Sequence, residues 1–145
     1  MDYRNAFAVS AAGMTVQKLR LDVTALNLAN MQTTRGVDGK PFQPMRVVVD
    51  GQVSAFANQF DRLASGGTAA LPQVRIETMN VAPRLVLDPG HPDADERGYV
   101  SLPGVDHVGE MVNLSGALRT YEANVVALNA AKAMAQKALE LGGGQ

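Results

Sequence analysis

The densest group of residues that could do chemistry lies in the segment Asp88-Pro89-Gly90-His91-Pro92-Asp93-Ala94-Asp95-Glu96-Arg97-Gly98. Its acidic residues invite comparison with a calcium-binding loop, where Asp93, Asp95 and Gly98 would match the first, third and sixth positions. The match then fails, because Arg97 occupies the fifth position and Gly104 stands where a bidentate glutamate is needed. A turn rich in Pro, Gly and Asp before a strand explains the segment, so we predict no metal site.

The other residue types used in catalysis are sparse. The chain has two histidines, His91 and His107, and neither has a second histidine at a spacing typical of zinc. No serine lies in a nucleophile-elbow motif. Cysteine is absent, which excludes disulfides, thiolate metal sites and cysteine nucleophiles. We predict that the protein is not an enzyme and has no catalytic residues and no cofactor.

Composition favours packing over chemistry. The 145 residues suit one ordinary domain, and 13 basic against 14 acidic residues give a net charge of −1, so no nucleic-acid partner is predicted. Charged residues form 19% of the chain and apolar residues 46%, whereas soluble domains average about 25% charged residues. Such a shortage of charge indicates surface that is covered in an assembly. The apolar content is mostly aliphatic and Ala, which favours helix packing over a pocket for a small-molecule substrate.

The first element that these patterns predict is a helix over residues 2–31. Spacings of three and four residues form an apolar seam, which Asn30 continues, at Val9, Ala12, Val16, Leu19, Val23 and Leu26. A second seam repeats every seven residues, at Phe7, Met14, Leu21 and Leu28. A helix that is apolar on two sides requires neighbours on two sides.

A second helix is predicted over residues 106–141. Its main seam contains one basic residue, Lys132, which we expect in solvent or in an ion pair across subunits. The seam consists of Met111, Leu114, Leu118, Tyr121, Val125, Leu128, Lys132, Ala135 and Leu139. A further apolar edge is formed by Val112, Val126 and Ala133. Asparagines in the two helices either set the register of a seam or are solvated surface; they are Asn27, Asn30, Asn113, Asn124 and Asn129.

Between the helices the chain is punctuated by proline and glycine. All seven prolines lie there, together with short β-prone runs at 45–49, 73–77, 84–87 and 98–102. The predicted fold class is mainly α with a small β region: long N- and C-terminal helices packed as a coiled-coil-like pair, and a middle segment rich in β-hairpins. The predicted organisation is a discontinuous helical assembly core of residues 1–35 and 106–141, an outer β-rich element of 36–105 with a flexible part at 57–71, and a Gly-rich tail at 142–145.

Two of these segments resemble a known family. The run Ala25-Leu26-Asn27-Leu28-Ala29-Asn30-Met31-Gln32-Thr33-Thr34-Arg35-Gly36 is similar to the N-terminal motif of bacterial flagellar rod and hook proteins. A second segment resembles the C-terminal helix of these proteins, in the runs Glu110-Met111-Val112-Asn113-Leu114 and Arg119-Thr120-Tyr121-Glu122-Ala123-Asn124. The stretch 88–100, and Thr33-Thr34-Arg35-Gly36 with the Asp-Gly that follows, look like the C-type proximal rod proteins in particular. The likeness covers residues 1–50 and 84–141; Leu118 departs from the small residue expected at its position.

The resemblance implies a structural subunit of the flagellar proximal rod. It implies terminal helices that pack with other rod subunits and with the same protein in an axial assembly, next to adaptor components of the basal body. It also implies export through the flagellar type III apparatus without a cleaved signal peptide. The residues that match the family's motifs would act in assembly; they are Ala29, Asn30, Thr33, Gly36, Met111, Val112, Asn113, Arg119, Tyr121, Glu122 and Asn124. With them we predict as interface the seam residues Val9, Val16, Leu19, Val23, Leu26, Leu114, Leu118, Val125 and Leu128.

Two other functions fit parts of the sequence. A soluble helical adaptor could dimerise in the cytoplasm through the same seams, and truncation of residues 111–141 would then leave flagellation intact. A small metal-dependent enzyme using His91, Asp93 and Asp95 is a poor alternative, because the calcium-loop pattern fails. A secretory signal peptide is also not expected, because Asp2 occupies the region that should be basic and the apolar run 6–12 is short and rich in Ala.

Overall fold

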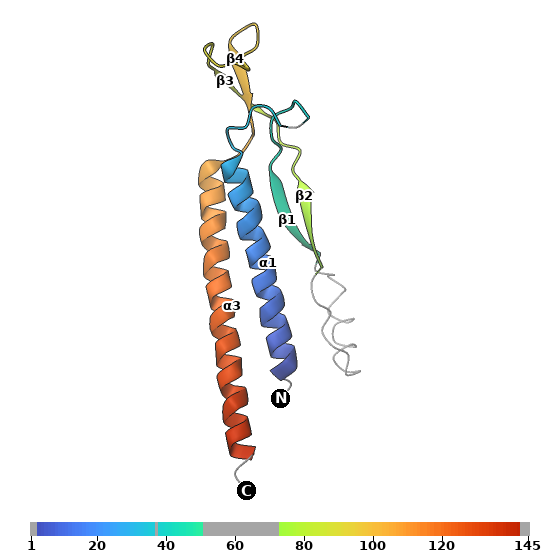
Figure 1. Ribbon diagram of the computed structural model, residues 1–145, viewed down its shortest axis with the longest axis vertical. Helices are drawn as coiled ribbons and strands as arrows, with labels where there is room; N and C mark the ends of the chain where they lie inside the picture. Colours follow the sequence, from blue (N-terminus) through green and yellow to red (C-terminus); the bar gives the residue numbers. More distant parts are fainter. Residues whose placement is uncertain (1–2, 37, 51–72, 143–145) are drawn as a thin grey trace. The chain divides into compact units, whose positions relative to one another are not determined.

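The computed structural model of the protein describes residues 3–36, 38–50 and 73–142. Over these residues the order of elements is α1 (Tyr3–Ala29), β1 (Met45–Asp50), β2 (Gln73–Thr78), β3 (Arg84–Leu87), β4 (Tyr99–Leu102) and α3 (His107–Gly142) (Figure 1). The predicted fold class is confirmed at the level of a mainly helical chain with small strand pairs. The predicted flexible part at 57–71 lies outside the described residues.

The strands form two separate two-stranded sheets, β1 with β2 and β3 with β4. The pair β3–β4 is antiparallel, with Arg84 opposite Leu102 and Leu87 opposite Tyr99. Each strand agrees with a predicted β-prone run to within one residue at either end. Strand β4 begins after Gly98, whose φ of +80° lies in the left-handed region that favours glycine. A Cβ at this position would also lie 3.1 Å from Cγ of Pro89.

The helix ends follow from capping chemistry. Helix α3 begins at His107 because Asp106 is its N-cap: Oδ1 of Asp106 accepts a hydrogen bond from the backbone N–H of Val108 at 3.1 Å. Helix α1 ends at Ala29, two residues before the predicted end. There Asn30 closes the last turn, since its Nδ2 donates to the carbonyl oxygen of Leu26 at 2.9 Å.

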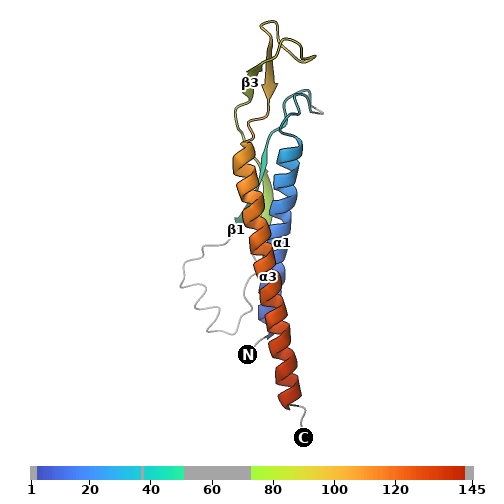
Figure 2. The same ribbon diagram turned by 90° about the vertical axis from the view of Figure 1, so that its left-hand side faces the viewer.

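The chain divides into two compact units, each of which is made of segments that lie apart in the sequence. Within the described residues, the helical unit contains 3–19, 49–50, 73–75 and 117–142, and the hairpin unit contains 20–36, 38–48 and 76–116. In the helical unit, the segments of α1 and α3 lie side by side in both Figure 1 and Figure 2. The hairpin unit contains the pair β3–β4 together with the end of α1 and the start of α3.

Candidate assembly interface

The face of α1 that is buried in the chain is partly polar. Val16 and Val23 of the predicted seam are buried, but Val9 and Leu26 at its two ends are exposed. Beside the buried valines lie Gln17, Thr24 and Asn27, which are buried as well. Leu19 and Asn30 are half-buried and Ala29 is exposed. The second predicted seam is only half-buried along its whole length, at Phe7, Met14, Leu21 and Leu28.

The packed face of α3 differs from the predicted seam at alternate positions. The fully buried residues are Ala117 and Ala131, and the half-buried ones on the same face are Leu114, Tyr121, Asn124, Leu128 and Ala135. Leu118 and Lys132, which directly follow the two buried alanines in the sequence, are exposed. The exposure of Lys132 agrees with the prediction that it lies in solvent or in an ion pair across subunits, and the interface role of Leu118 stays a prediction. Alanine one position earlier allows a closer approach to the rest of the chain than leucine or lysine would.

A close approach between the helices is visible at Gly13. A Cβ built at Gly13 would lie 2.9 Å from Nδ2 of Asn124, a contact that real Cβ atoms do not make. Both residues belong to the helical unit. Asn124 therefore lies against α1 rather than in solvent, and the glycine that weakens α1 as a helix former makes room for it.

Asn27 is a structural residue of the hairpin unit. Its side chain is 1% exposed. The amide oxygen accepts a hydrogen bond from the N–H of Met45 at 2.9 Å, and the amide nitrogen donates to the carbonyl oxygen of Met45 at 2.8 Å. The side chain thereby makes the same two hydrogen bonds that a neighbouring strand would make with the first residue of β1. Of the two roles considered for Asn27, solvated surface is excluded.

The motif after α1 forms a hydrogen-bonded turn. Oγ1 of Thr33 donates to Oδ1 of Asn30 at 3.2 Å, and the N–H of Phe42 donates to the carbonyl oxygen of Thr33 at 3.3 Å. The N–H of Gly36 donates to the carbonyl oxygen of Lys40 at 2.8 Å. Thr33 and Gly36 are half-buried. These hydrogen bonds therefore fix the backbone conformation of the turn that follows α1.

In the segment 88–98, the side chains of Asp88, His91 and Asp95 accept hydrogen bonds from nearby backbone N–H groups. Oδ1 of Asp95 accepts the N–H groups of Arg97 and Tyr99 at 2.9 and 2.8 Å, and Oδ1 of Asp88 accepts the N–H of Gly90 at 3.2 Å. Nδ1 of His91 accepts the N–H of Asp93 at 3.0 Å. Within the described residues, no group of three or more His, Cys, Asp or Glu could hold a metal ion.

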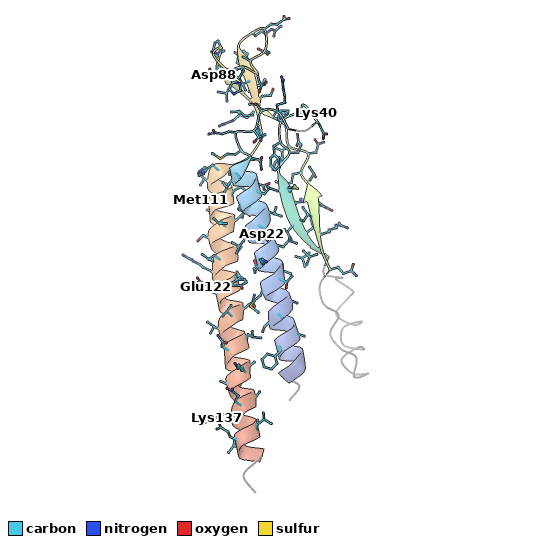
Figure 3. The ribbon with its side chains drawn as sticks, in the orientation of Figure 1. Asp22, Lys40, Asp88, Met111, Glu122 and Lys137 are labelled. Atoms are coloured by element: carbon cyan, nitrogen blue, oxygen red, sulfur yellow. The ribbon has the colours of Figure 1, made fainter. Side chains whose placement is uncertain are left out.

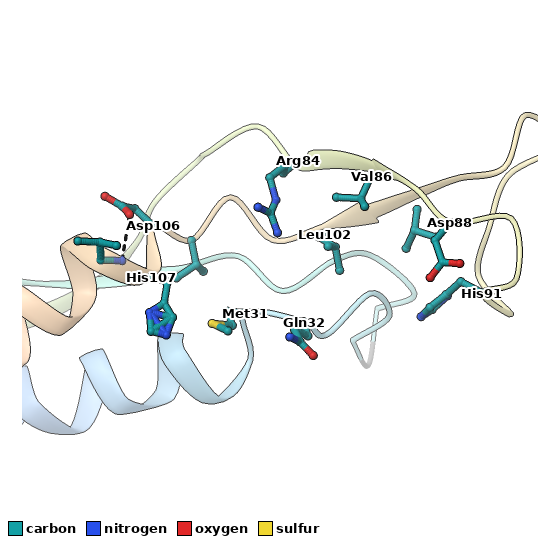
Figure 4. A pocket seen from close by; sticks show the side chains of 12 residues that line it. Met31, Gln32, Arg84, Val86, Asp88, His91, Leu102, Asp106 and His107 are labelled. Atoms are coloured by element: carbon teal, nitrogen blue, oxygen red, sulfur yellow. Dashed lines mark hydrogen bonds between the residues drawn. The ribbon is translucent and has the colours of Figure 1, made fainter.

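A cavity of about 440 Å³ lies in the hairpin unit. One face of the β3–β4 pair lines it with Arg84, Val86, Val100 and Leu102 (Figure 4). The remaining lining comes from the chain after α1, from the 88–98 loop and from the start of α3: Met31, Gln32, Asp88, His91, Val105, Asp106, His107 and Val108. Three of the ionisable side chains that line the cavity, those of Asp88, His91 and Asp106, accept hydrogen bonds from backbone N–H groups. They do not form a nucleophile–base pair.

Large apolar side chains are exposed on the other faces. On the outer face of the β3–β4 pair, Leu85 and Leu87 are 64% and 62% exposed. On α3, exposed apolar residues lie roughly opposite the buried alanines at Val108, Val112 and Val126, and further exposed ones lie on the flanks and at the end of the helix, at Met134, Leu139 and Leu141. Met111, which is also exposed, is labelled on α3 in Figure 3 together with the exposed Glu122 and Lys137.

The remaining predicted interface residues divide between exposed and half-buried positions. The exposed ones on α3 are Val112, Asn113, Leu118, Arg119 and Glu122. The half-buried ones are Leu114, Tyr121, Asn124, Val125 and Leu128. Burial within one chain does not test a contact with a neighbour, so these assignments remain predictions. Sequence analysis missed the buried Gln17 and Thr24, although their seven-residue spacing follows the helix repeat.

No helix among the described residues has both the length and the apolar character needed to cross a membrane. The long helices that the described residues form, with an exposed apolar side, are typical of structural proteins that pack against partners.

Comparison with known proteins agrees with this class. Residues 96–141 match the family "Flagellar basal body rod FlgEFG protein C-terminal". The flagellar basal-body rod protein FlgC of Escherichia coli O6:H1 is 41% identical over 138 residues, which cover 95% of this chain and 96% of that protein. FlgC of Bacillus subtilis strain 168 is 41% identical, covering 92% and 94%, and FlgC of Aquifex aeolicus is 34% identical, covering 97% of each chain. The chain belongs to the FlgC family of flagellar basal-body rod proteins, as its motifs predicted.

Proposed function

We propose that this protein is a structural subunit of the bacterial flagellar proximal rod, where its terminal helices assemble into the axial drive shaft needed for motility. Residues 1–35 and 106–141 form the helical assembly core, packed as a coiled-coil-like pair. Residues 36–105 form an outer β-rich element and 142–145 a Gly-rich tail. Its partners are other rod subunits, further copies of the same chain and adjacent adaptor components of the basal body. It reaches the basal body through the flagellar type III apparatus without a cleaved signal peptide.

The observation that carries this proposal is the second apolar side of α3. One side is covered, at Ala117 and Ala131, while the opposite side leaves Val112 66% exposed and Val126 68% exposed. Each apolar side chain left in water forgoes stabilisation of about 25 cal/mol per Å². A soluble monomer would place polar residues on that side. Neighbouring subunits that cover it would recover this free energy.

Within the assembly, the predicted interface residues have different roles. The exposed ones, such as Val9, Leu26, Met111 and Leu118, contact neighbouring subunits directly. The buried or half-buried ones, such as Val16 and Tyr121, hold the helix pair that presents them. A drive shaft must resist torsion, and helices packed lengthwise with many lateral contacts meet that requirement.

The test is complementation of a flagellated strain that lacks its own copy of this protein. The intact chain is expected to restore swimming and complete rods in electron micrographs of isolated basal bodies. Deletion of residues 111–141 should abolish both. The double variant Val112→Ser and Val126→Ser should reduce both, although it removes no buried residue. Intact flagellation with either variant would contradict the proposal, and for the deletion it would favour the soluble dimeric adaptor instead.

A further inference from the structure

We propose that Asp93 is a positioning residue for rod assembly, because its carboxylate fastens the β3–β4 loop to the chain that leaves α1. Oδ2 of Asp93 accepts a hydrogen bond from Oγ1 of Thr34 at 2.7 Å, across 59 positions of sequence. Oδ1 of Asp93 lies 3.0 Å from Nη2 of Arg35. Both carboxylate oxygens are therefore engaged by one short segment. The inference rests on the proposed function and adds to it a specific residue.

Asp93 differs in this respect from the other carboxylates of its loop. Asp88 and Asp95 accept hydrogen bonds from backbone N–H groups of the loop itself. The loop also closes through its own backbone, with the N–H of Asp88 donating to the carbonyl oxygen of Gly98 at 2.9 Å and the N–H of Asp95 donating to that of Tyr99 at 2.8 Å. The carboxylate of Asp93 is not required for that closure, so its side chain is free to join the loop to another segment.

The segment that Asp93 contacts, like the loop, has backbone hydrogen bonds of its own. The N–H of Thr33 donates to the carbonyl oxygen of Asn30 at 3.0 Å. The N–H of Gly36 donates to the carbonyl oxygen of Lys40, and the carbonyl oxygen of Thr33 accepts the N–H of Phe42. Asp93 therefore connects two preformed pieces of the hairpin unit. One piece continues from α1, and the other leads through β4 into α3. This connection fixes the end of α1 relative to the strand that precedes α3.

The two partners of Asp93 contribute unequally. The Arg35 side chain is 67% exposed, and ion pairs of exposed arginines contribute little because water screens them. The Asp93 side chain is 24% exposed, and a short hydroxyl bond to a partly buried carboxylate is among the stronger hydrogen bonds. We therefore expect Thr34 to matter more than Arg35.

The first measurement is amide hydrogen exchange of the purified full-length chain. Asp93→Ala and Thr34→Val should each raise the exchange rates of the loop amides of His91, Ala94 and Gly98 about tenfold, and the double variant should raise them no further. Thr34→Ser keeps the hydroxyl and should exchange like the unaltered chain. Glu96→Ala removes an exposed carboxylate from the same loop and is the matched control.

The second measurement is swimming of the complemented strain with the same variants. Asp93→Ala and Thr34→Val should reduce swimming, whereas Thr34→Ser and Glu96→Ala should not. Unchanged exchange in Thr34→Val, or loosening by Glu96→Ala of the same size, would overturn the fastening role. Loosened exchange with normal swimming would overturn the positioning role.

These results can be separated from failure of the proposed function itself. If the unaltered chain does not restore swimming, the proposed function fails, and the positioning role fails with it. The exchange data would then still decide whether Asp93 fastens the loop. If Asp93→Ala does not fold, the pair Thr34→Val and Thr34→Ser answers both questions, because these substitutions leave the carboxylate in place.

Discussion

The hairpin unit and the helical unit are stabilised in different ways. In the hairpin unit, polar side chains such as Asn27 and Asp93 find hydrogen-bonding partners within the same chain. In the helical unit, small residues such as Ala131 are buried while Val126 and Leu141 remain in solvent. Side-chain hydrogen bonds between distant segments tie the hairpin unit together, whereas the helical unit buries small apolar residues. Both units leave large apolar side chains exposed, and Leu85 and Leu87 of the hairpin unit are 64% and 62% exposed. The difference indicates that the hairpin unit depends on particular hydrogen bonds within the chain, whereas the helical unit depends on close packing of small residues.

The largest effect that could break this comparison is expected at Asn27. Asn27→Ala leaves the buried N–H and C=O of Met45 without these partners, at a cost of about 2–4 kcal/mol in the free energy of unfolding. Urea unfolding of the purified chain, followed by circular dichroism, measures this cost. Asn113→Ala, at an exposed position of α3, is the control. If the two substitutions had equal effects, the hairpin unit would not depend on its internal hydrogen bonds.

A smaller loss is expected at the N-cap of α3. Asp106→Ala removes the acceptor for the N–H of Val108 and should cost about 1 kcal/mol. Asp106→Asn keeps an equally good cap and should cost little. Amide exchange at Val108 reports the fraying of the first turn directly. Equal exchange in the two variants would show that the cap does not fix the start of the helix.

The contact between Gly13 and Asn124 can be tested against a second helical glycine. Gly116→Ala meets no atom within 4 Å and should raise the free energy of unfolding by about 0.5–1 kcal/mol through helix propensity. Gly13→Ala should give less than this gain, because the amide of Asn124 must move. Adding Asn124→Ala to Gly13→Ala should restore the gain. If both glycines tolerated alanine equally, the helices would not be in close contact there.

The sequence predicted the elements well because their signals are local. Proline positions, β-prone runs and the Gly-rich stop bounded, to within two residues, the four strands and two helices that the described residues form. The sequence did not fix which face of α3 packs against the rest of the chain. A seam of large apolar residues and a seam of alanines one position earlier have the same periodicity. Which of the two is packed depends on how closely the helices approach, and the approach is close at Gly13, where a Cβ would lie 2.9 Å from Nδ2 of Asn124.

The roles of the polar residues were the hardest to predict. Asn27 and Thr34 lie within the run that resembles the family's N-terminal motif, but neither was predicted to act in assembly. Their partners Met45 and Asp93 lie far away in the sequence. Long-range side-chain hydrogen bonds leave no periodic signal. The acidic segment was predicted to be a turn, yet the contact of Asp93 with Thr34 and Arg35 became apparent only in the three-dimensional structure.

The smallest expected effect on the isolated chain is the one that sharpens the comparison most. Val126→Ser alters a side chain that is 68% exposed, so the free energy of unfolding should change by less than about 0.5 kcal/mol. In the complemented strain the same substitution should reduce swimming, because a serine hydroxyl would be buried against a neighbouring subunit. Asn129→Ser, an exposed polar residue less than one turn away, should change neither quantity. If Val126→Ser destabilised the monomer but left swimming intact, the exposed side of α3 would serve the fold of the single chain rather than the rod.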